Sequence, residues 1–284
     1  MLHGKALHAV EFIRAHIPSG AVGVGFRGGG NLRGGLSPEQ IASTLKRMSP
    51  RLATVTNSHE AIDQTLYAMP RGELRTEVIA LLRHGRQRRR PRARGHDRRG
   101  QIPNMTPIST RPAEIEERLI PGHWEGDTIK GNYNRSAVGT LVVRFTLFTV
   151  LAKMNGTGAD AALAGFSRML DRIDTQKRLS IIYDRGKEMV KHEQLTDKTG
   201  VKVYFADPHA PWQRGANENT NGLIRQYLPK GEDLSQYSQP QLDQFAWLLN
   251  SRPRKSLGWK CPAELFLPDF DFVAYYEKFF ALRN

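Results

Sequence analysis

From Gly122 onward the chain alternates between strand-like and helix-like segments, and this alternation constrains the fold more than any other feature. Apolar and β-branched runs predict strands, and they lie at residues 138–152, 179–183 and 201–205. Stretches with an apolar face at helical spacing predict helices, and they lie at residues 159–170, 214–227 and 239–250. The order of hairpin strands, helix, strand, short helix, strand and helices predicts a mixed α/β layer fold.

The chain before residue 83 has a different character. Residues 1–35 combine a short amphipathic stretch with a glycine-rich segment, so we expect an irregular N-terminal segment there. The four residues from Ser37 to Gln40 have the pattern of a capping box with Pro at the first helical position. A second helix start follows at Ser58. Two short helices in a basic chain predict a helix-turn-helix-like DNA-binding region over residues 36–82, although any small helical bundle shows the same pattern.

Arginine dominates residues 83–99, which hold nine of them. Such a run repels itself and buries nothing, so residues 83–112 are interpreted as an Arg-rich linker, or as an arm that tracks phosphates, ahead of a catalytic core at residues 113–284. The whole chain carries 42 basic and 28 acidic side chains, a net charge of +14. Because each Lys or Arg that meets a phosphate releases condensed counterions, this excess favours a nucleic-acid partner over an anionic lipid or a merely cationic surface.

The cysteine content and the apolar runs exclude several other classes of protein. The single cysteine, Cys261, rules out an internal disulfide and a multi-cysteine zinc site, and we expect it to be a buried small hydrophobe. No apolar run reaches the ~18–20 residues that a membrane span needs. No export signal is recognisable at the start. We therefore expect a cytoplasmic protein with no membrane partner.

Three acidic residues fall where an α/β sheet places ligand-binding groups. Asp127 lies in the predicted first strand, where a period of two puts Glu125 on the same face. Asp184 directly follows the strand at 179–183, at the carboxyl end where open α/β sheets bind ligands. Glu218 lies on a polar face of the helix at 214–227. The opposite side of that helix carries the residues expected to pack on the sheet, which are Ala216, Leu223 and Tyr227.

Acids that converge on one crevice repel one another unless cations neutralise them. Oxygen ligands without a cysteine or histidine cluster favour Mg²⁺ or Mn²⁺ over zinc. Two such ions about 3.5–4 Å apart activate an attacking oxygen and stabilise the leaving oxygen at phosphorus. A single acid is better interpreted as a surface carboxylate or a helix cap. Three acids, with 57 residues from Asp127 to Asp184 and 33 residues between Asp184 and Glu218, favour a metal site.

The segments around these acids resemble the DDE transposases of bacterial insertion elements, in the insertion-sequence family numbered thirty. The matching segments are Pro121-Gly122-His123-Trp124-Glu125-Gly126-Asp127, Asp184-Arg185-Gly186-Lys187-Glu188-Met189, Trp212-Gln213-Arg214-Gly215 through Asn221-Gly222, and Asn250-Ser251-Arg252-Pro253-Arg254-Lys255. The 33-residue interval is also that family's spacing. The resemblance runs from about residue 37 to residue 266 and is closest from residue 101 onward.

The resemblance implies a ribonuclease H-like integrase catalytic core, a mixed sheet flanked by helices, preceded by the small helix-turn-helix-like region. It implies a catalytic and metal-binding triad of Asp127, Asp184 and Glu218 that holds two divalent ions, Mg²⁺ with Mn²⁺ as a substitute, and it selects Asp127 over Glu125. The implied activity is strand cleavage at element ends, which leaves a 3′ hydroxyl, and transfer of that hydroxyl to double-stranded target DNA. It also implies homo-oligomers that pair two element ends, in a bacterial, nucleoid-associated protein.

Cationic and amide side chains near these acids are candidate DNA contacts, with helix-dipole and solubility roles as the alternative. They are Arg88, Arg89, Arg90, Arg214, Asn217, Asn221, Arg225, Lys230, Arg252, Arg254 and Lys255. Gly222 lets a DNA backbone approach closely. Trp212 is interpreted either as packing against the sheet, which is preferred, or as stacking on an unpaired base at the cut end. His209 fits either a phosphate contact or a hydrogen-bonded loop residue.

Two other functions are compatible with the same three acids. A metal-dependent nuclease of the same fold cuts DNA without joining it, and it has less need of a long basic front. An N-terminally truncated, decayed transposase acts only as a DNA-binding protein, but the presence of all three acids argues against decay of the core. Members of the family begin with an additional helix-turn-helix region that residues 1–35 do not resemble, so we expect a truncated or frame-shifted start.

Overall fold

The computed structural model describes residues 36–48, 102–112, 115, 120–208 and 210–281. Its contacts divide the chain into two units. We call residues 95–251 with 265–268 the core unit, and residues 1–94 with 252–264 and 269–284 the terminal unit. No helix among the described residues is both long and apolar enough to cross a membrane.

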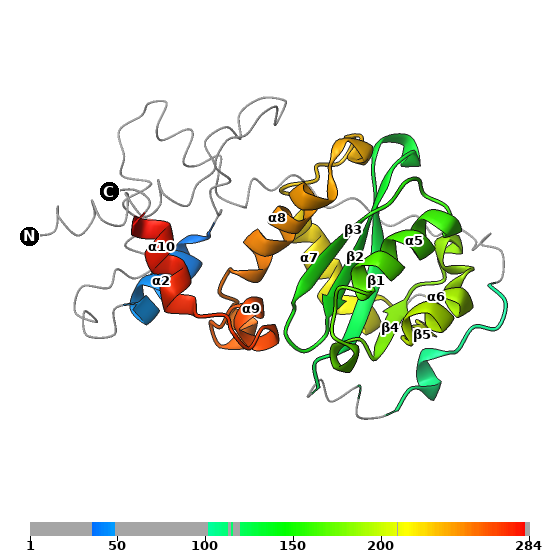
Figure 1. The fold of residues 1–284 in the computed structure, drawn as a ribbon, viewed down its shortest axis with the longest axis horizontal. Helices are drawn as coiled ribbons and strands as arrows, with labels where there is room; N and C mark the ends of the chain where they lie inside the picture. The colour runs from blue at the N-terminus through cyan, green and yellow to red at the C-terminus, as the bar shows by residue number, and fades with distance from the viewer. Residues whose placement is uncertain (1–35, 49–101, 113–114, 116–119, 209, 282–284) are drawn as a thin grey trace, which may run out of the picture. The chain divides into compact units, whose positions relative to one another are not determined.

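A five-stranded mixed sheet forms the centre of the core unit, in the order β3-β2-β1-β4-β5 (Figure 1). Its strands are β1 (His123–Lys130), β2 (Ala137–Val143), β3 (Thr149–Lys153), β4 (Ser180–Tyr183) and β5 (Lys202–Phe205). β1 pairs antiparallel with β2, and β2 pairs antiparallel with β3. β4 runs parallel to both β1 and β5. The mixed sheet predicted from the sequence is therefore confirmed.

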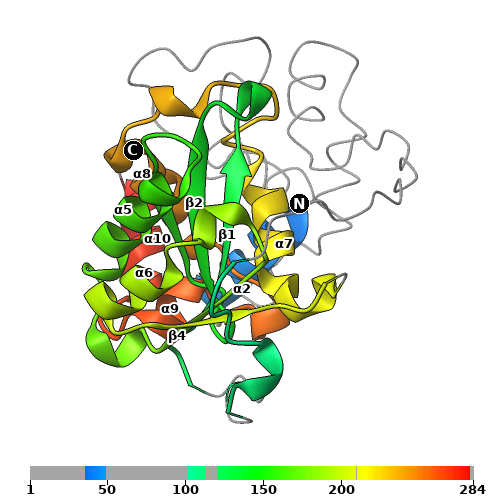
Figure 2. The same cartoon turned by 90° about the vertical axis from the view of Figure 1, so that its right-hand side faces the viewer.

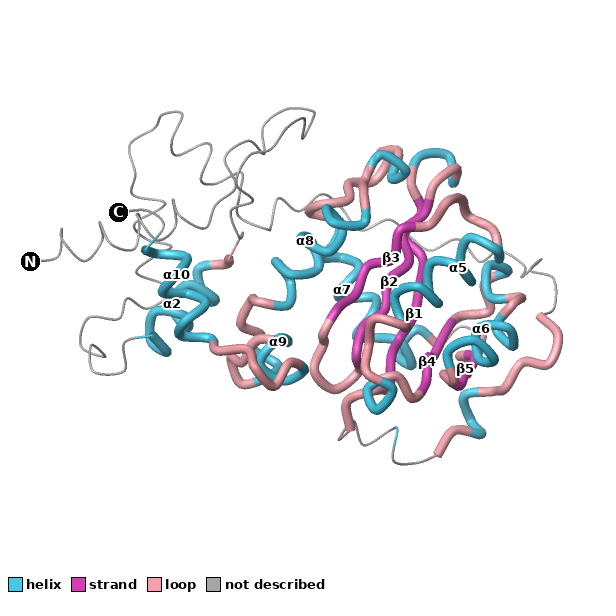
Figure 3. The backbone as a smooth tube through the Cα atoms, in the orientation of Figure 1, coloured by secondary structure: helices cyan, strands magenta, loops and turns pink. Residues whose placement is uncertain are grey.

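The predicted strand run at 138–152 forms two strands rather than one (Figure 3). The chain turns between Val143 and Thr149, where the amide of Leu147 donates to the carbonyl of Val143 at 2.9 Å. Leu147 takes a positive φ of 59° in this turn. All seven residues of β2 are buried, because the strand has a neighbour on each edge and helices on its faces.

Helices cover both faces of this sheet. They are α5 (Ala159–Leu170), α6 (His192–Thr199), α7 (Gly215–Ile224) and α8 (Gln239–Asn250). Figure 2 shows α5 and α6 on one side of β1 and β2, and α7 on the other. α8 packs against β3 and against α7. The resulting arrangement has three layers, with the sheet between two layers of helices.

Local signals explain where these helices begin. α5 and α8 have the bounds predicted from their apolar faces. Ser238 begins α8 with a capping box, since its hydroxyl accepts from the Gln241 amide and the Gln241 side chain accepts in return. The stretch predicted as one helix at 214–227 is shorter than expected. It starts as the 3-10 turn η7 (Pro211–Arg214) and is regular α-helix only in α7.

One close contact between β1 and β4 depends on a glycine in β1. Trp124, Phe166, Ile181 and Tyr183 belong to one buried apolar cluster. A side chain at Gly126 would place its Cβ 2.7 Å from Cδ2 of Tyr183, closer than real Cβ atoms approach. The missing side chain at residue 126 therefore lets the Tyr183 ring pack closely against β1.

The described part of the terminal unit joins α2 (Pro38–Met48) to segments from the other end of the chain. The predicted capping box is confirmed, because Gln40 N donates to Ser37 Oγ at 3.3 Å and Ser37 N donates to Gln40 Oε1 at 2.9 Å. Arg47 binds Glu264 through its two terminal guanidinium nitrogens, and it stacks over the ring of Phe272. The C-terminal helices are α9 (Pro262–Phe266) and α10 (Phe272–Ala281).

The predicted domain boundaries, with one catalytic core over residues 113–284, stay a prediction. Among the described residues, 252–264 and 269–281 group with residues 36–48. The second predicted helix near Ser58, the irregular segment 1–35 and the Arg-rich linker from residue 83 to 101 lie outside the described residues. Cys261 is fully buried, as expected of a small hydrophobe.

Candidate active site

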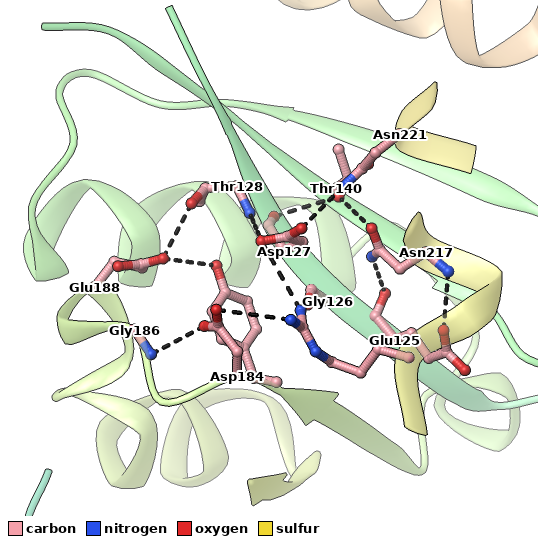
Figure 4. Close-up of polar contacts among 12 residues, drawn as sticks. Glu125, Gly126, Asp127, Thr128, Thr140, Asp184, Gly186, Glu188, Asn217 and Asn221 are labelled. Carbon is pink, nitrogen blue, oxygen red and sulfur yellow. Dashed lines mark hydrogen bonds and ion pairs between the residues drawn. The ribbon is translucent and has the colours of Figure 1, made fainter. Parts of the chain in front are cut away.

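Asp127 lies within β1, three residues before its last residue, and its carboxylate is hydrogen-bonded from two sides (Figure 4). The amide of Thr128 donates to Asp127 Oδ1 at 2.8 Å. Asn221, on α7, donates from Nδ2 to Asp127 Oδ2 at 2.9 Å. Both carboxylate oxygens are thus oriented by the protein, one by β1 itself and the other by α7.

Asp184 directly follows β4, the parallel neighbour of β1. Its Oδ1 accepts a hydrogen bond of 2.9 Å from the amide of Gly186, so the turn after the strand fixes this carboxylate (Figure 4). In the parallel pairing of β1 with β4, Glu125 lies opposite Ile182, so Asp127 and Asp184 each follow two residues after a paired position. The role of these two acids as metal ligands stays a prediction.

Arg214 bridges the two carboxylates. Its Nη1 lies 3.9 Å from Asp127 Oδ1, and its Nη2 lies 3.7 Å from Asp184 Oδ2. The guanidinium also donates from Nη1 to the carbonyl of Gly126 at 3.4 Å, and the side chain is mostly buried. The structure therefore places one positive charge between two negative ones.

The electrostatics of the site favour binding of further positive charge. Burial raises the pKa of the Asp127 carboxyl to about 6, while Arg214 lowers it and the neighbouring carboxylates of Asp184 and Glu188 raise it. Burial, with the same carboxylates, also raises the pKa of the Tyr183 hydroxyl well above its usual value. An acid that is costly to ionise beside other acids is typical of a functional site.

Glu218 lies on α7 with its side chain exposed. No described contact joins it to Asp127 or Asp184. Arg214 and Asn221, which do contact Asp127, lie four residues before it and three residues after it, on the same side of the helix. Among the described residues no group of three or more His, Cys, Asp or Glu side chains is close enough to hold a metal ion. The structure thus brings two of the three predicted acids together and places the third on the adjoining helix.

The predicted division of α7 into a polar face and a core face needs correction. Asn217 and Thr220 are buried on the side that packs against β1 and β2, together with Ala216 and Leu223. Tyr227, expected to pack on the sheet, lies beyond the end of α7 and stacks on the ring of Phe245 of α8. The amide side chain of Asn217 can enter this interface because its hydrogen bonds are satisfied within it.

Several predicted DNA contacts are placed elsewhere by the structure. Asn217 is 0% exposed, and all its described partners are protein groups, so its side chain does not face solvent. Arg225 donates to the carbonyls of Leu228 and Lys130, and burial lowers its pKa. In the terminal unit, Arg252 is only 3% exposed. The buried side chains of Asn217 and Arg252 cannot meet a phosphate without rearrangement, whereas Arg225 is half-buried.

Other predicted contacts remain accessible to a ligand. Lys230 is exposed in the core unit, and Lys255 is exposed in the terminal unit, where it pairs with Glu39. Arg254 is half-buried in the terminal unit. The remaining predicted contacts lie outside the described residues, namely Arg88, Arg89 and Arg90, as does His209.

The exposure of Trp212 contradicts the preferred prediction for this residue. Packing against the sheet would bury the indole, but 72% of the residue is exposed. It lies in η7, two residues before Arg214. The alternative interpretation, stacking on a base, is compatible with this exposure.

The contacts of two acids near the site could not be predicted from the sequence. Glu188 accepts hydrogen bonds from the hydroxyls of Thr128 and Tyr183, at 3.0 and 3.4 Å, and so adds a third carboxylate beside Asp127 and Asp184. Glu125 is buried under the start of α7 with Arg144 as its ion-pair partner. Both acids stood in the quoted motifs, but side-chain direction was needed to show what they contact.

Comparisons with known proteins agree with this geometry. The integrase core domain family matches residues 119–211, which include Asp127 and Asp184. The transposase of insertion element IS1086 from Cupriavidus metallidurans is 55% identical over 229 residues, covering 81% of this chain and 68% of that protein. The InsI transposase of IS30A from Escherichia coli is 43% identical over 234 residues, covering 81% of this chain and 60% of that protein.

More distant proteins extend the comparison. The transposase of IS4351 from Bacteroides fragilis is 38% identical over 243 residues, covering 83% of this chain and 70% of that protein. Among solved structures, the HTLV-2 integrase catalytic core domain in complex with magnesium covers 52% of this chain and 98% of its own, at 18% identity and a TM-score of 0.39, a likeness too remote to bear on the chemistry. The predicted family is confirmed by the sequence relatives. The chain belongs to the transposases of bacterial insertion elements, in the family of the IS30 transposases.

Proposed function

We propose that this chain carries out metal-dependent cleavage of DNA strands at element ends and transfer of the cut strand to target DNA. The observation that carries the proposal is the approach of Asp127, within β1, and Asp184, directly after the parallel neighbour β4, to the guanidinium of Arg214, on an integrase-type core. Family membership supports the same chemistry. The chain spans about two thirds of the IS1086 relative and 60% of the IS30A relative, so the activity of a whole transposase is part of the proposal.

The residues at this edge of the sheet fit hard divalent cations. Every candidate ligand is an oxygen, the type that Mg²⁺ and Mn²⁺ prefer. Beside Asp127, the Oδ1 atom of Asn221 is buried and has no hydrogen-bond partner among the described residues. The raised pKa of the Asp127 carboxyl, caused by burial and by neighbouring carboxylates, supports a site that is stabilised by added positive charge. Asp127, Asp184 and Glu218 would hold the ions. When bound, two such ions supply Lewis-acid activation of the attacking oxygen and stabilisation of the leaving oxygen.

The reaction consists of two displacements at phosphorus. In the first, a water oxygen forms a bond to phosphorus, the bond to the 3′ oxygen of the element strand breaks, and that oxygen leaves as a 3′ hydroxyl. In the second, this hydroxyl oxygen attacks a phosphodiester of the target, whose own 3′ oxygen leaves. The number of phosphodiester bonds is unchanged in the second step, so no ATP and no covalent protein intermediate are required.

The protein's own groups orient these steps. Thr128 and Asn221 fix the two oxygens of Asp127, and Gly186 fixes Asp184. Arg214 lies between Asp127 and Asp184 and is suited to bind a phosphate oxygen as DNA enters. The exposed indole of Trp212 offers a flat surface on which an unpaired base at the cut end can stack.

The proposed substrates are double-stranded DNA of the element ends and of the target. Lys230 and Lys255 present exposed charge to phosphates, each in its own unit. The net charge of +14 gives the chain a general attraction to DNA. We further propose that a homo-oligomer pairs two element ends on the DNA, with the protein located in the cytoplasm at the nucleoid.

A joining assay tests the proposal. The protein is incubated with labelled element-end DNA, unlabelled target duplex and Mg²⁺, beside Asp184→Asn and Glu218→Gln. We expect cleaved and joined products from the parent protein and a loss on the order of a thousandfold in both variants, because each removes a metal ligand. Asp197→Asn is the matched control, since this exposed residue of α6 makes the same charge change away from the site.

Each alternative predicts a different product pattern. Cleavage without joined product would favour a nuclease of the same fold. Binding of element-end DNA without cleavage in Mg²⁺ or Mn²⁺ would favour a protein that only occupies the ends. Equal activity of Asp184→Asn and the parent protein would overturn the assignment of the carboxylates.

A further inference from the structure

Glu125 is a completely buried acid that the proposed chemistry does not use. Its side chain is 0% exposed, and it lies two residues before Asp127 on β1. Its Oε1 accepts a hydrogen bond of 3.2 Å from Nε of Arg144, which is only 5% exposed. Its Oε2 accepts a hydrogen bond of 2.9 Å from the backbone amide of Asn217. One buried carboxylate thus connects β1, the turn after β2 and the first turn of α7.

The first turn of α7 depends on this carboxylate. The residue that precedes the helix, Arg214, provides no side-chain cap. A helix leaves its first amides without partners inside the helix, and a negative group there is favoured by the helix dipole. Glu125 supplies both an acceptor and a negative charge from a neighbouring strand, in place of a cap from the helix's own sequence.

Asn217 adds two further bonds at the same junction (Figure 4). Its Nδ2 donates to the backbone carbonyl of Glu125 at 2.8 Å, and its Oδ1 accepts from the hydroxyl of Thr140 on β2 at 3.3 Å. One turn later, Asn221 donates to Asp127. Contacts at residues 217 and 221 fix both the rotation of α7 and its position along β1.

Two predicted metal ligands, Asp127 and Glu218, must be positioned relative to each other, and both lie directly beside this junction. Asp127 is two residues after Glu125, and Glu218 is the residue after Asn217. We propose that Glu125, held by Arg144, is a positioning residue that sets the register of Glu218 relative to Asp127. This inference rests on the proposed function, because it assigns Glu125 a role in assembling that metal site.

Stability alone does not explain a buried ion pair at this junction. Removing two charges from water costs about as much as their attraction returns, and apolar residues of similar volume commonly stabilise as well or better. A carboxylate that binds one particular amide adds directional information that apolar packing lacks. The pair therefore suits a joint in which position, more than stability, is required.

Two double variants separate position from stability. Glu125→Gln with Arg144→Met removes both charges and keeps an oxygen that accepts from the Asn217 amide. Glu125→Leu with Arg144→Met removes the same charges and has no acceptor. The two proteins therefore differ in the bond to α7 and share the loss of the ion pair.

The readouts are Mn²⁺ affinity by calorimetry, thermal unfolding without metal, and strand joining. We expect Glu125→Gln/Arg144→Met to bind Mn²⁺ within about threefold of the parent protein. We expect Glu125→Leu/Arg144→Met to bind it roughly 10–100-fold more weakly, the usual effect of losing a group that orients a metal ligand. Equal Mn²⁺ affinity in the two folded proteins would overturn the inference, and so would a difference confined to the unfolding temperature.

Thr140→Val provides a second test if either double variant fails to fold. It removes one hydroxyl from the same junction with little change of volume, and we expect Mn²⁺ affinity to fall by about threefold or more at an unchanged unfolding temperature. Unchanged affinity in Thr140→Val would count against the positioning role. Asp184→Asn separates failure of the positioning role from failure of the proposed function. If this variant does not reduce Mn²⁺ binding, the proposed metal site itself is wrong.

Discussion

The amide nitrogen Nδ2 of Asn221 lies 2.9 Å from Oδ2 of Asp127, so α7 and β1 are joined at the carboxylate itself. The same helix carries Glu218, and the same strand carries Glu125. A movement of α7 would therefore disturb Asp127 and Glu218 together. This coupling makes variants of α7 informative about the site.

Asn221→Ala should weaken metal binding without unfolding the protein. The substitution leaves Asp127 Oδ2 without its donor, so the carboxylate loses a fixed orientation. We expect Mn²⁺ affinity to fall by roughly tenfold, as for other groups that orient a ligand. Asn219→Ala is the matched control, because residue 219 is exposed on the same helix. A similar loss in both variants would show that the effect comes from the helix and not from the bond.

Arg214→Gln should bind metal more tightly and DNA more weakly. The guanidinium neutralises Asp127 and Asp184, so cations must compete with it. A charge pair at about 4 Å contributes on the order of 1 kcal/mol or more, which corresponds to at least about a fivefold rise in Mn²⁺ affinity without DNA. Arg172→Gln makes the same change at an exposed position that pairs with Asp243. A fall in Mn²⁺ affinity in Arg214→Gln would contradict the competition.

The metal-free protein should lose stability as the pH rises through about 6. Burial raises the pKa of the Asp127 carboxyl to about 6, so the folded protein binds this proton more tightly than the unfolded chain does. The contribution of the protonated Asp127 carboxyl to the free energy of unfolding is fully present below pH 4 and is lost as the pH passes 6. Its size is on the order of 2–3 kcal/mol. Urea unfolding of Asp127→Asn at pH 4.5 and pH 7.5 should show a smaller decrease than the parent protein.

Metal binding should show the opposite dependence on pH. The ions need the ionised Asp127 carboxylate, so Mn²⁺ affinity should rise by up to about tenfold per pH unit below 6 and level off above pH 7. Calorimetric titrations from pH 5 to pH 8 measure this. A flat affinity profile across pH 6 would show that the group with the raised pKa does not bind the ion.

Two glycine substitutions should change stability in opposite directions. Gly126→Ala places a Cβ 2.7 Å from the ring of Tyr183, and we expect it to cost about 1–3 kcal/mol in the free energy of unfolding. Gly222→Ala meets no atom within 4 Å and lies within α7, so it should gain about 0.5–1 kcal/mol. If DNA approaches α7 closely at Gly222, the more stable variant will bind element-end DNA less tightly. Thermal unfolding and a gel-shift titration measure the two effects.

Regular features of the fold were predictable because their signals are local. The apolar face of 239–250 and the capping residues near Ser238 define α8 without reference to the rest of the chain. The capping box at Ser37 likewise marks α2. Asp184 was placed at the carboxyl end of a strand because the apolar run at 179–183 and the turn after it are readable from the sequence. Such signals depend on neighbours in sequence.

The remaining features depend on contacts between distant segments. Asn217 looks like a surface amide in a polar helix, and only its bonds to β1 and β2 explain its burial. Glu125 and Asp127 share a face of one strand, so periodicity alone could not decide which of them pairs with Arg144. The grouping of residues 252–264 with α2 follows from partners more than two hundred residues away. Pattern analysis along the chain does not reach such partners.

The distance along the chain between the partners in the terminal unit also orders events during synthesis. Gln40 donates to the carbonyl of Pro253, 213 residues later in the chain, and Arg47 binds Glu264, 217 residues later. At about 5–20 residues per second, a ribosome needs roughly 10–40 s to make the missing segment. α2 therefore leaves the ribosome long before its packing partners exist, while the strands and helices of the core unit are already complete. A nascent chain acquires its proposed cutting machinery first and completes the α2 region last.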